Sequence, residues 1–233
     1  MFEWALADDS GEWTVDKNPV DGAKKYPEEK RERWLSEEEL QRLADALEEY
    51  PHQCGQGALS KKQQEWLQTE ARRAMNALRL IMVTGCRKGE ALTAKWTDFD
   101  LTRGVWTKPS HKTKEKKTEH VPLSAQALAL LEGMEHTGEY LFPGRTGGNL
   151  QDVKTPWTKV CRLAKLQGVR VHDLMHTYAS YLVSSGVSLP VVGKLLGHSQ
   201  PQTTARYAHL ADNPQREAAN RFPQILPTGH MVQ

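Results

Sequence analysis

The last third of the chain concentrates side chains that can attack phosphorus, move protons or hold an anion. Residues 171–210 contain the two histidines of HDLMH, the histidine of LLGH and the tyrosine of TTARYAHL. Each is expected at the edge of a helix, where a side chain can act on a ligand. Upstream, TGCRKGEAL places Arg87 in a tight interhelical turn with its side chain free to point away, and SHKTKEKKT carries a cluster of lysines.

A phosphodiester is the substrate class that suits this set. Its two non-bridging oxygens gain negative charge toward a pentacoordinate transition state, so cleavage without a metal requires several fixed cationic or N–H donors. It also requires a nucleophile and an acid for the leaving oxygen. Arg87, a lysine of the basic tip, His172, His198 and Tyr207 can fill these roles. The sequence has no evident acidic cluster of the kind that holds two magnesium ions, which favours metal-free chemistry.

Composition indicates a soluble, intracellular protein with one main domain. The 233 residues have a mean hydropathy of −0.65 and contain no apolar run near the roughly 20 residues that a membrane helix needs. The start lacks the basic and apolar regions of a secretory signal. Three widely spaced cysteines, Cys54, Cys86 and Cys161, form no CxxC pair, so free thiols in the cytoplasm are expected rather than disulfides or zinc.

The distribution of charge is more informative than the net charge of +2. Residues 103–120 hold six basic and two acidic side chains, and residues 154–170 hold five basic side chains and no acid. Acidic residues concentrate instead in residues 28–49. This asymmetry indicates a polyanion bound on one side, although ordinary solvated faces also carry such runs.

Capping signals and periodicity predict a mainly α fold with a small antiparallel β-sheet. Boxes at Ser36 and Ser60 start one helix that stops before Pro51 and a central core helix that ends at Gly85. Short strands are expected at 96–100, 104–108 and 119–122, the last two forming a hairpin around the lysines. Further helices are expected after residue 124, at 155–167, from HDLMH to residue 186, at 190–196 and at 201–208.

Four motifs in this order, TGCRKGEAL, the lysine hairpin before VPLS, HDLMHTYAS and LLGHSQPQTTARYAHL, resemble those of the tyrosine recombinases, or phage-type integrases. The resemblance spans about residues 33–212. It implies an integrase-like catalytic domain over residues 27–212, preceded at 1–26 by the end of a truncated core-binding domain with its linker, and followed by a tail at 213–233. Because this family clamps DNA between two domains, the chain alone is expected to bind DNA weakly.

The resemblance also implies roles for individual residues. Arg87 resembles the first phosphate-binding arginine, and Lys112 the general acid toward the departing 5′-oxygen, with Lys114 as the second candidate because hairpin length varies. His172 resembles the histidine that bonds the phosphate and helps to deprotonate the nucleophile, and His198 the later phosphate donor. Tyr207 resembles the nucleophile that forms a 3′-phosphotyrosine. Because the bond energy is kept in that link, the resemblance implies no ATP or other cofactor. Lys114, Lys159 and Arg206 are the expected DNA-binding side chains.

One position departs from the family's pattern H-x-x-R, because the fourth residue of HDLMH is Met175. Methionine has neither charge nor donor, so one arginine clamp on the scissile phosphate is absent, and strongly impaired cleavage is predicted. The fold is expected to tolerate this adaptable side chain.

The function favoured by the sequence is site-specific DNA recombination, as in viral genome integration. The implied partners are a double-stranded DNA attachment site and sister subunits that form a tetramer on DNA, with no membrane. The alternative is a non-catalytic DNA-binding or assembly remnant of an integrase, and a type IB topoisomerase is a third possibility with the same chemistry.

Each singled-out residue also has a plainer interpretation. His172 and His176 at i and i+4 resemble a metal pair, but no third ligand is placed nearby and the Glu of HExxH is missing. His198 can be a helix-end neighbour, Tyr207 a packing aromatic, and Arg87 a donor to helix-end carbonyls. The tryptophans Trp66, Trp96, Trp106 and Trp157 are expected to be core or partly buried, with Trp157 and Lys159 as the exceptions on the DNA side.

Overall fold

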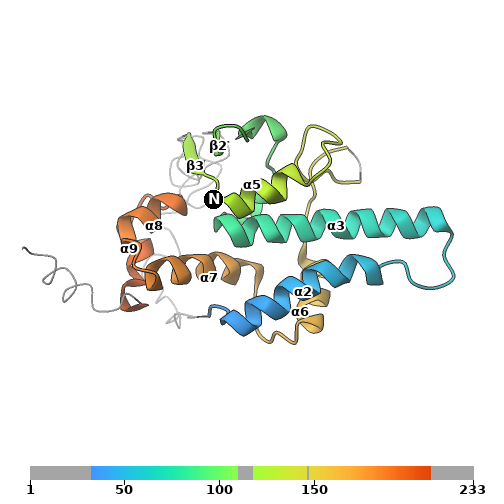
Figure 1. Cartoon of the computed structure of the whole chain (residues 1–233), viewed down its shortest axis with the longest axis horizontal. Coiled ribbons are helices and arrows are strands. Elements are labelled where there is room, and N and C mark those ends of the chain that lie inside the picture. Colours follow the sequence, from blue (N-terminus) through green and yellow to red (C-terminus); the bar gives the residue numbers. More distant parts are fainter. Residues whose placement is uncertain (1–32, 110–117, 146, 211–233) are drawn as a thin grey trace, which may run out of the picture. The chain divides into compact units, whose positions relative to one another are not determined.

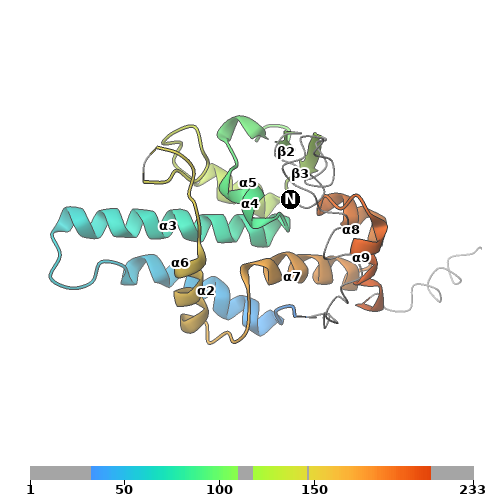
Figure 2. The same cartoon turned by 180° about the vertical axis from the view of Figure 1, so that it is seen from behind.

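The long helix α3 (Lys61–Thr84) is the element on which most of the other helices pack. The computed structural model describes residues 33–109, 118–145 and 147–210. Helices α2 (Glu37–Gln53), α5 (Ala125–Glu132), α6 (Lys154–Leu163) and α7 (Val171–Ser184) all contact α3, as Figures 1 and 2 show from opposite sides. The other elements are α4 (Lys88–Leu92), η1 (Trp96–Asp98), β1 (Phe99–Asp100), β2 (Val105–Lys108), β3 (Glu119–Pro122), α8 (Leu189–Leu195), α9 (Pro201–Ala205) and η2 (Ala208–Leu210).

Both of the predicted capping boxes are present. The Ser36 hydroxyl accepts from the Glu39 N–H at the start of α2, and Ser60 and Gln63 form the same pair at the start of α3. Gly85 ends α3 at φ +65°, a left-handed conformation that glycine adopts without strain. These local signals fix where the central helix begins and ends.

The apolar side chains form two clusters. The larger one joins α2, α3, α5, α6 and the start of α7, and Leu43, Leu78 and Leu174 are among its fully buried members. The smaller one lies between the rest of α7, α8 and the end of the described chain. It consists of Met175, Ala179, Val183, Val192, Leu196 and Tyr207.

The sheet has the order β1-β2-β3 and is antiparallel throughout. Strands β2 and β3 confirm the predicted hairpin, with Trp106 opposite Val121. The prediction for residues 96–100 was wrong in its first half, where a 3₁₀ turn precedes the two-residue β1. The Asp98 carboxylate accepts from the Lys95 N–H at 2.9 Å and closes this turn, a side-chain bond that competes with strand pairing.

Two helix ends also differ from the prediction. Helix α2 continues through Pro51 to Gln53, because Tyr50 and Pro51 are buried and this packing outweighs the lost backbone donor. Helix α6 ends at Leu163 rather than at residue 167. Lys165 adopts φ +54°, and the Leu166 N–H reaches back to the Cys161 carbonyl at 2.8 Å.

The tryptophans were only partly predicted. Trp106 is buried and Trp96 is partly buried, as expected, but Trp66 is 46 % exposed. Trp157, expected on the DNA side, is instead 5 % exposed in the core, and its Nε1 donates to the Val169 carbonyl at 3.1 Å. Within the described residues, no helix is long and apolar enough to cross a bilayer.

Candidate active site

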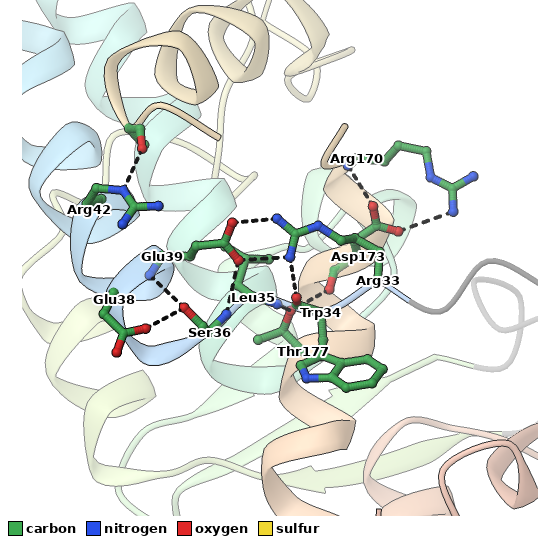
Figure 3. A network of polar contacts seen from close by, with 11 residues as sticks. Arg33, Trp34, Leu35, Ser36, Glu38, Glu39, Arg42, Arg170, Asp173 and Thr177 are labelled. Atoms are coloured by element: carbon green, nitrogen blue, oxygen red, sulfur yellow. Dashed lines mark hydrogen bonds and ion pairs between the residues drawn. The ribbon is translucent and has the colours of Figure 1, made fainter. Parts of the chain in front are cut away.

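The start of α7 is held in place by the segment that precedes α2. The Leu35 N–H donates to Thr177 Oγ1 at 3.0 Å, and this hydroxyl donates to the Asp173 carbonyl at 2.7 Å (Figure 3). The buried Asp173 carboxylate in turn accepts from the Arg170 N–H at 2.8 Å and from its guanidinium at 3.2 Å. This network fixes the helix turn that carries the histidines of HDLMH.

Arg87 is the N-cap residue of α4, directly after the turn that ends α3. Its Nη1 contacts Glu90 Oε1 at 2.8 Å, and its Nη2 donates to the Gly197 carbonyl at 3.2 Å. The expectation of a side chain free to point away was therefore wrong, since two partners aim the guanidinium. The helix-end carbonyl it binds belongs to the segment after α8, so Arg87 is tied to the residue beside His198.

Glu90 also binds Lys108, which sequence reasoning did not single out. Lys108 Nζ lies 2.6 Å from Glu90 Oε2, and the lysine is only 3 % exposed. Burial alone would raise the pKa of Glu90, but Lys108 and Arg87 outweigh it and hold that pKa below its usual range. The R-x-x-E spacing, which brings Arg87 and Glu90 together at i,i+3, was the available signal for this pair.

His198 follows Gly197, whose φ of +63° turns the chain at the end of α8. Its Nδ1 lies 2.9 Å from Thr204 Oγ1, and its N–H donates to the Gly193 carbonyl at 2.8 Å. A threonine hydroxyl that donates to Nδ1 leaves Nε2–H as the outward donor. Burial, followed by Arg87 and Arg206, lowers the pKa of His198 to about 4.

His172 and His176 lie one helical turn apart on α7 with perpendicular rings, 4.8 Å between centroids. His172 is exposed, whereas His176 is 9 % exposed. Partial desolvation and the cations Arg170, Arg206 and Arg87 lower the pKa of His172, against the opposing carboxylate of Asp173. The same two arginines, Arg87 and Arg206, thus act on His172 and on His198, while the carboxylates of Asp173 and Glu90 oppose them.

Tyr207 lies between α9 and η2 and is 5 % exposed. Its hydroxyl lies 2.5 Å from Nδ1 of His176, rather than against His172 as the resemblance suggested for proton removal. Burial raises the pKa of Tyr207 to about 12, although Arg206 opposes this shift. Sequence reasoning had weighed His176 only as a metal ligand. Within the described residues, no group of three or more His, Cys, Asp or Glu side chains is placed to hold a metal.

Met175 belongs to the apolar cluster that covers Tyr207, and it is 5 % exposed. The position where the family pattern has a cation therefore contributes hydrocarbon and sulfur beside the phenol. This removes a charge that would favour phosphate and adds to the desolvation that keeps the phenol neutral.

Of the other four predicted residues, one lies beside this group, one lies apart from it and two fall outside the described residues. Lys112 and Lys114 fall within residues 110–117, which the structure does not describe. Arg206 is exposed beside Tyr207. Lys159 is exposed on α6 and lines a cavity of about 970 Å³ with residues of α2 and α3.

Known proteins resemble the chain over much of its length. The sequence profile of the Phage integrase family matches residues 33–214. The chain belongs to this family. It is 28 % identical to the integrase of Salmonella phage P22, an alignment that covers 93 % of the chain and 54 % of the relative. It is 33 % identical to tyrosine recombinase XerC of Xanthomonas campestris over 57 % of the chain and 43 % of the relative.

Solved structures confirm the predicted fold. The crystal structure of XerH site-specific recombinase bound to difH substrate superposes with a TM-score of 0.59, covering 81 % of this chain and 54 % of that one at 23 % identity. The chain has the mainly α fold with a small antiparallel sheet of a tyrosine recombinase catalytic domain. It spans about half the length of the curated relatives it matches.

Proposed function

We propose that this chain carries out site-specific DNA recombination through a covalent 3′-phosphotyrosine at Tyr207. The observation that carries this proposal is the convergence of the family's phosphate ligands and its nucleophile. Arg87 donates a hydrogen bond to the carbonyl of Gly197, the residue before His198. The His198 ring is hydrogen-bonded to Thr204, and Tyr207 follows three residues after that threonine. Arg87 and Arg206 both act on His172 and His198, and the positive charge of these two arginines can attract an anionic phosphate to the same site.

In the proposed reaction, Arg87, His172 and His198 bind the non-bridging oxygens of the scissile phosphate. The Tyr207 oxygen attacks phosphorus and the bond to the 5′-oxygen breaks. Lys112, or Lys114 in the second assignment, protonates that leaving oxygen. A 5′-hydroxyl from another strand later attacks the phosphotyrosine, and because the energy of the phosphodiester is kept in that link, the reaction needs no ATP or other cofactor.

We further propose that Met175 impairs this reaction in the chain as it stands. Loss of one donor to a transition state typically lowers the rate by about 10²–10³. The apolar surroundings of Met175 support a second effect on the rate. They help to desolvate the Tyr207 phenol, and a desolvated phenol has a raised pKa and ionises less readily.

The proposed partners are a double-stranded DNA attachment site and further copies of the chain, assembled as a tetramer on that DNA. The solved XerH structure is a complex with its substrate DNA, which supports DNA as the partner class. We assign the catalytic domain to residues 27–212, with the end of a core-binding domain before it and a tail after it. Lys114, Lys159 and Arg206 are the proposed DNA contacts, the cytoplasm is the proposed location, and integration of a viral genome is the proposed process.

A second candidate function is a non-catalytic DNA-binding or assembly module. One observation favours it, namely that Met175 packs fully into the apolar cluster. Because of this packing, the domain can fold without the second arginine. A folded domain of this kind therefore does not depend on catalytic activity.

Covalent trapping separates these candidates. Duplexes that the chain binds are first selected from a randomised pool, and then nicked so that the released strand is lost and the adduct accumulates. The chain, Met175→Arg and Met175→Leu are compared, each with and without Tyr207→Phe. One outcome is a Tyr207-dependent adduct that is weak in the chain and in Met175→Leu and stronger in Met175→Arg. This outcome supports a recombinase that lacks one of its two phosphate-binding arginines. DNA binding without any adduct in all variants supports the binding module.

A further inference from the structure

We propose that His176 is a further catalytic residue, the acceptor of the proton that Tyr207 loses when its hydroxyl attacks the scissile phosphate. This inference rests on the proposed function, and it assigns a specific group to a step for which the family resemblance offered His172. The contact that motivates it joins Nδ1 of His176 to the Tyr207 hydroxyl at 2.5 Å.

The contact is shielded from solvent on both sides. His176 is 9 % exposed and Tyr207 is 5 % exposed, so water has little access to either partner. A buried phenol requires a hydrogen-bond partner, and His176 supplies it. The perpendicular ring of His172, 4.8 Å away, packs against the imidazole and limits its rotation. The hydroxyl is therefore directed at one acceptor.

The electrostatic surroundings keep this acceptor neutral. Burial, then His172 and Arg206, lower the pKa of His176 to about 4, while Asp173 raises it and Arg170 lowers it further. His172, Asp173 and Arg170 belong to the start of α7, and Arg206 belongs to the segment after α9. These are the two elements that carry charged groups around the His176 ring. A neutral imidazole that accepts at Nδ1 carries its proton on Nε2. At neutral pH its Nδ1 lone pair is therefore available to accept the hydrogen bond of the Tyr207 hydroxyl, and to accept the proton once its pKa rises.

The resting pair does not transfer the proton by itself. Burial holds the pKa of Tyr207 at about 12, far above that of His176, so the phenol stays protonated before DNA binds. A bound phosphodiester adds negative charge beside the imidazole and raises its pKa. As the Tyr207 oxygen bonds to phosphorus it loses its affinity for the proton, and transfer becomes favourable.

Atoms and charges balance in this step. The Tyr207 O–H bond breaks and its proton moves to Nδ1 of His176, which becomes an imidazolium. The tyrosine oxygen forms a bond to phosphorus, the bond to the 5′-oxygen breaks, and the hairpin lysine supplies the proton for that oxygen. When a 5′-hydroxyl later attacks the phosphotyrosine, its proton passes to the hairpin lysine that the first step left neutral, and the imidazolium returns its own proton to the departing Tyr207 oxygen.

The proposed roles of His172 and His176 differ because one side chain is exposed and the other is buried. His172 is exposed and lies near Arg87 and Arg206, where a phosphate can reach it. His176 is buried against the nucleophile. In the proposed arrangement one histidine binds the anion and the other takes the proton.

The test compares His176→Gln, which keeps an acceptor oxygen but cannot take a proton, with His176→Phe, which removes both properties. Both changes are made in Met175→Arg and in the unmodified chain. His136→Gln serves as the matched control, because His136 is exposed and packs on Trp96 away from Tyr207. The rate of the Tyr207-dependent adduct on nicked duplex is measured across pH, together with the thermal melting and DNA binding of each variant.

We expect both His176 variants in Met175→Arg to lose about 10²-fold or more in rate at neutral pH while they fold and bind DNA. The loss in His176→Gln should shrink toward alkaline pH, where the phenol ionises without help. A His176→Gln rate and pH profile equal to those of the Met175→Arg parent would overturn the proposal and leave the proposed function standing. Absence of any adduct, in Met175→Arg with His176 intact as well, would refute the proposed function and this inference with it.

Discussion

Replacing Lys108 with methionine tests the buried ion pair that holds Glu90, and through it Arg87. Lys108 is 3 % exposed and the Glu90 side chain 9 % exposed, with 2.6 Å between Nζ and Oε2. Methionine fills a similar volume, so the change removes charge with little loss of packing. Removing one partner of a buried pair costs about 3–5 kcal/mol. Because Arg87 still contacts Glu90, we expect the lower end, about 3 kcal/mol of unfolding free energy at neutral pH.

Urea unfolding at two pH values measures this effect and identifies its cause. Glu90 has a lowered pKa in the folded chain, so its ion pairs stabilise the fold above the unfolded pKa and that contribution is lost as pH falls through the folded pKa. In Lys108→Met the carboxylate that has lost its lysine becomes neutral at mildly acid pH. The deficit of the variant should therefore shrink between neutral pH and about pH 3.5.

Lys95→Met is the matched control. Lys95 also pairs with a glutamate at 2.6 Å, but its side chain is 32 % exposed and that of Glu139 is 60 % exposed. Solvent screens such a pair, so little change in unfolding free energy is expected. A Lys108→Met variant as stable as Lys95→Met, or a deficit that does not depend on pH, would show that the ion pair does not hold this part of the fold.

Three further predictions test other parts of the structure. Thr204→Val should lower both DNA binding in a filter-binding assay and the yield of covalent adduct in the trapping assay, because Nδ1 of His198 loses its hydrogen-bond partner. Thr203→Val, at an exposed position, should leave both quantities unchanged. Gly85→Ala should lower the melting temperature by several degrees because φ is +65° and the added Cβ meets packed side chains. At Gly89 an added Cβ meets nothing, so Gly89→Ala should leave the unfolding free energy unchanged or raise it by up to about 1 kcal/mol. Cys86 should react with iodoacetamide only on unfolding, since burial raises its pKa to about 11, and rapid native-state labelling would contradict its placement.

Local signals in the sequence predicted the elements that local chemistry determines. The boxes at Ser36 and Ser60, the glycine stop at Gly85 and the strands β2 and β3 all depend on neighbours within a few residues, and the structure confirms them. Errors arose where tertiary packing or a side-chain bond competes with propensity. Pro51 stays helical because it is buried, and Asp98 closes a turn where a strand was expected.

The motifs singled out Arg87, His172, His198 and Tyr207, but they did not indicate which groups these side chains bond. The bond between Arg87 and the Gly197 carbonyl spans 110 positions, and that between His176 and Tyr207 spans 31. Spacing within a helix or turn cannot indicate such pairs. Helical spacing did place His176 one turn from His172. Only the fold brings the phenol to it.

The replacement at position 175 separates the chemistry of this site from its architecture. An arginine there would have to keep its guanidinium outside the cluster formed by Ala179, Val183 and Leu196, or lose hydration within it. Methionine avoids that cost, so the chain can gain stability at the position where the family pattern has an arginine. Met175→Arg is accordingly expected to raise adduct formation while it lowers the melting temperature. If Met175→Arg raised both the adduct yield and the melting temperature, the guanidinium would have to form hydrogen bonds that methionine cannot form, for example with the Gly197 loop.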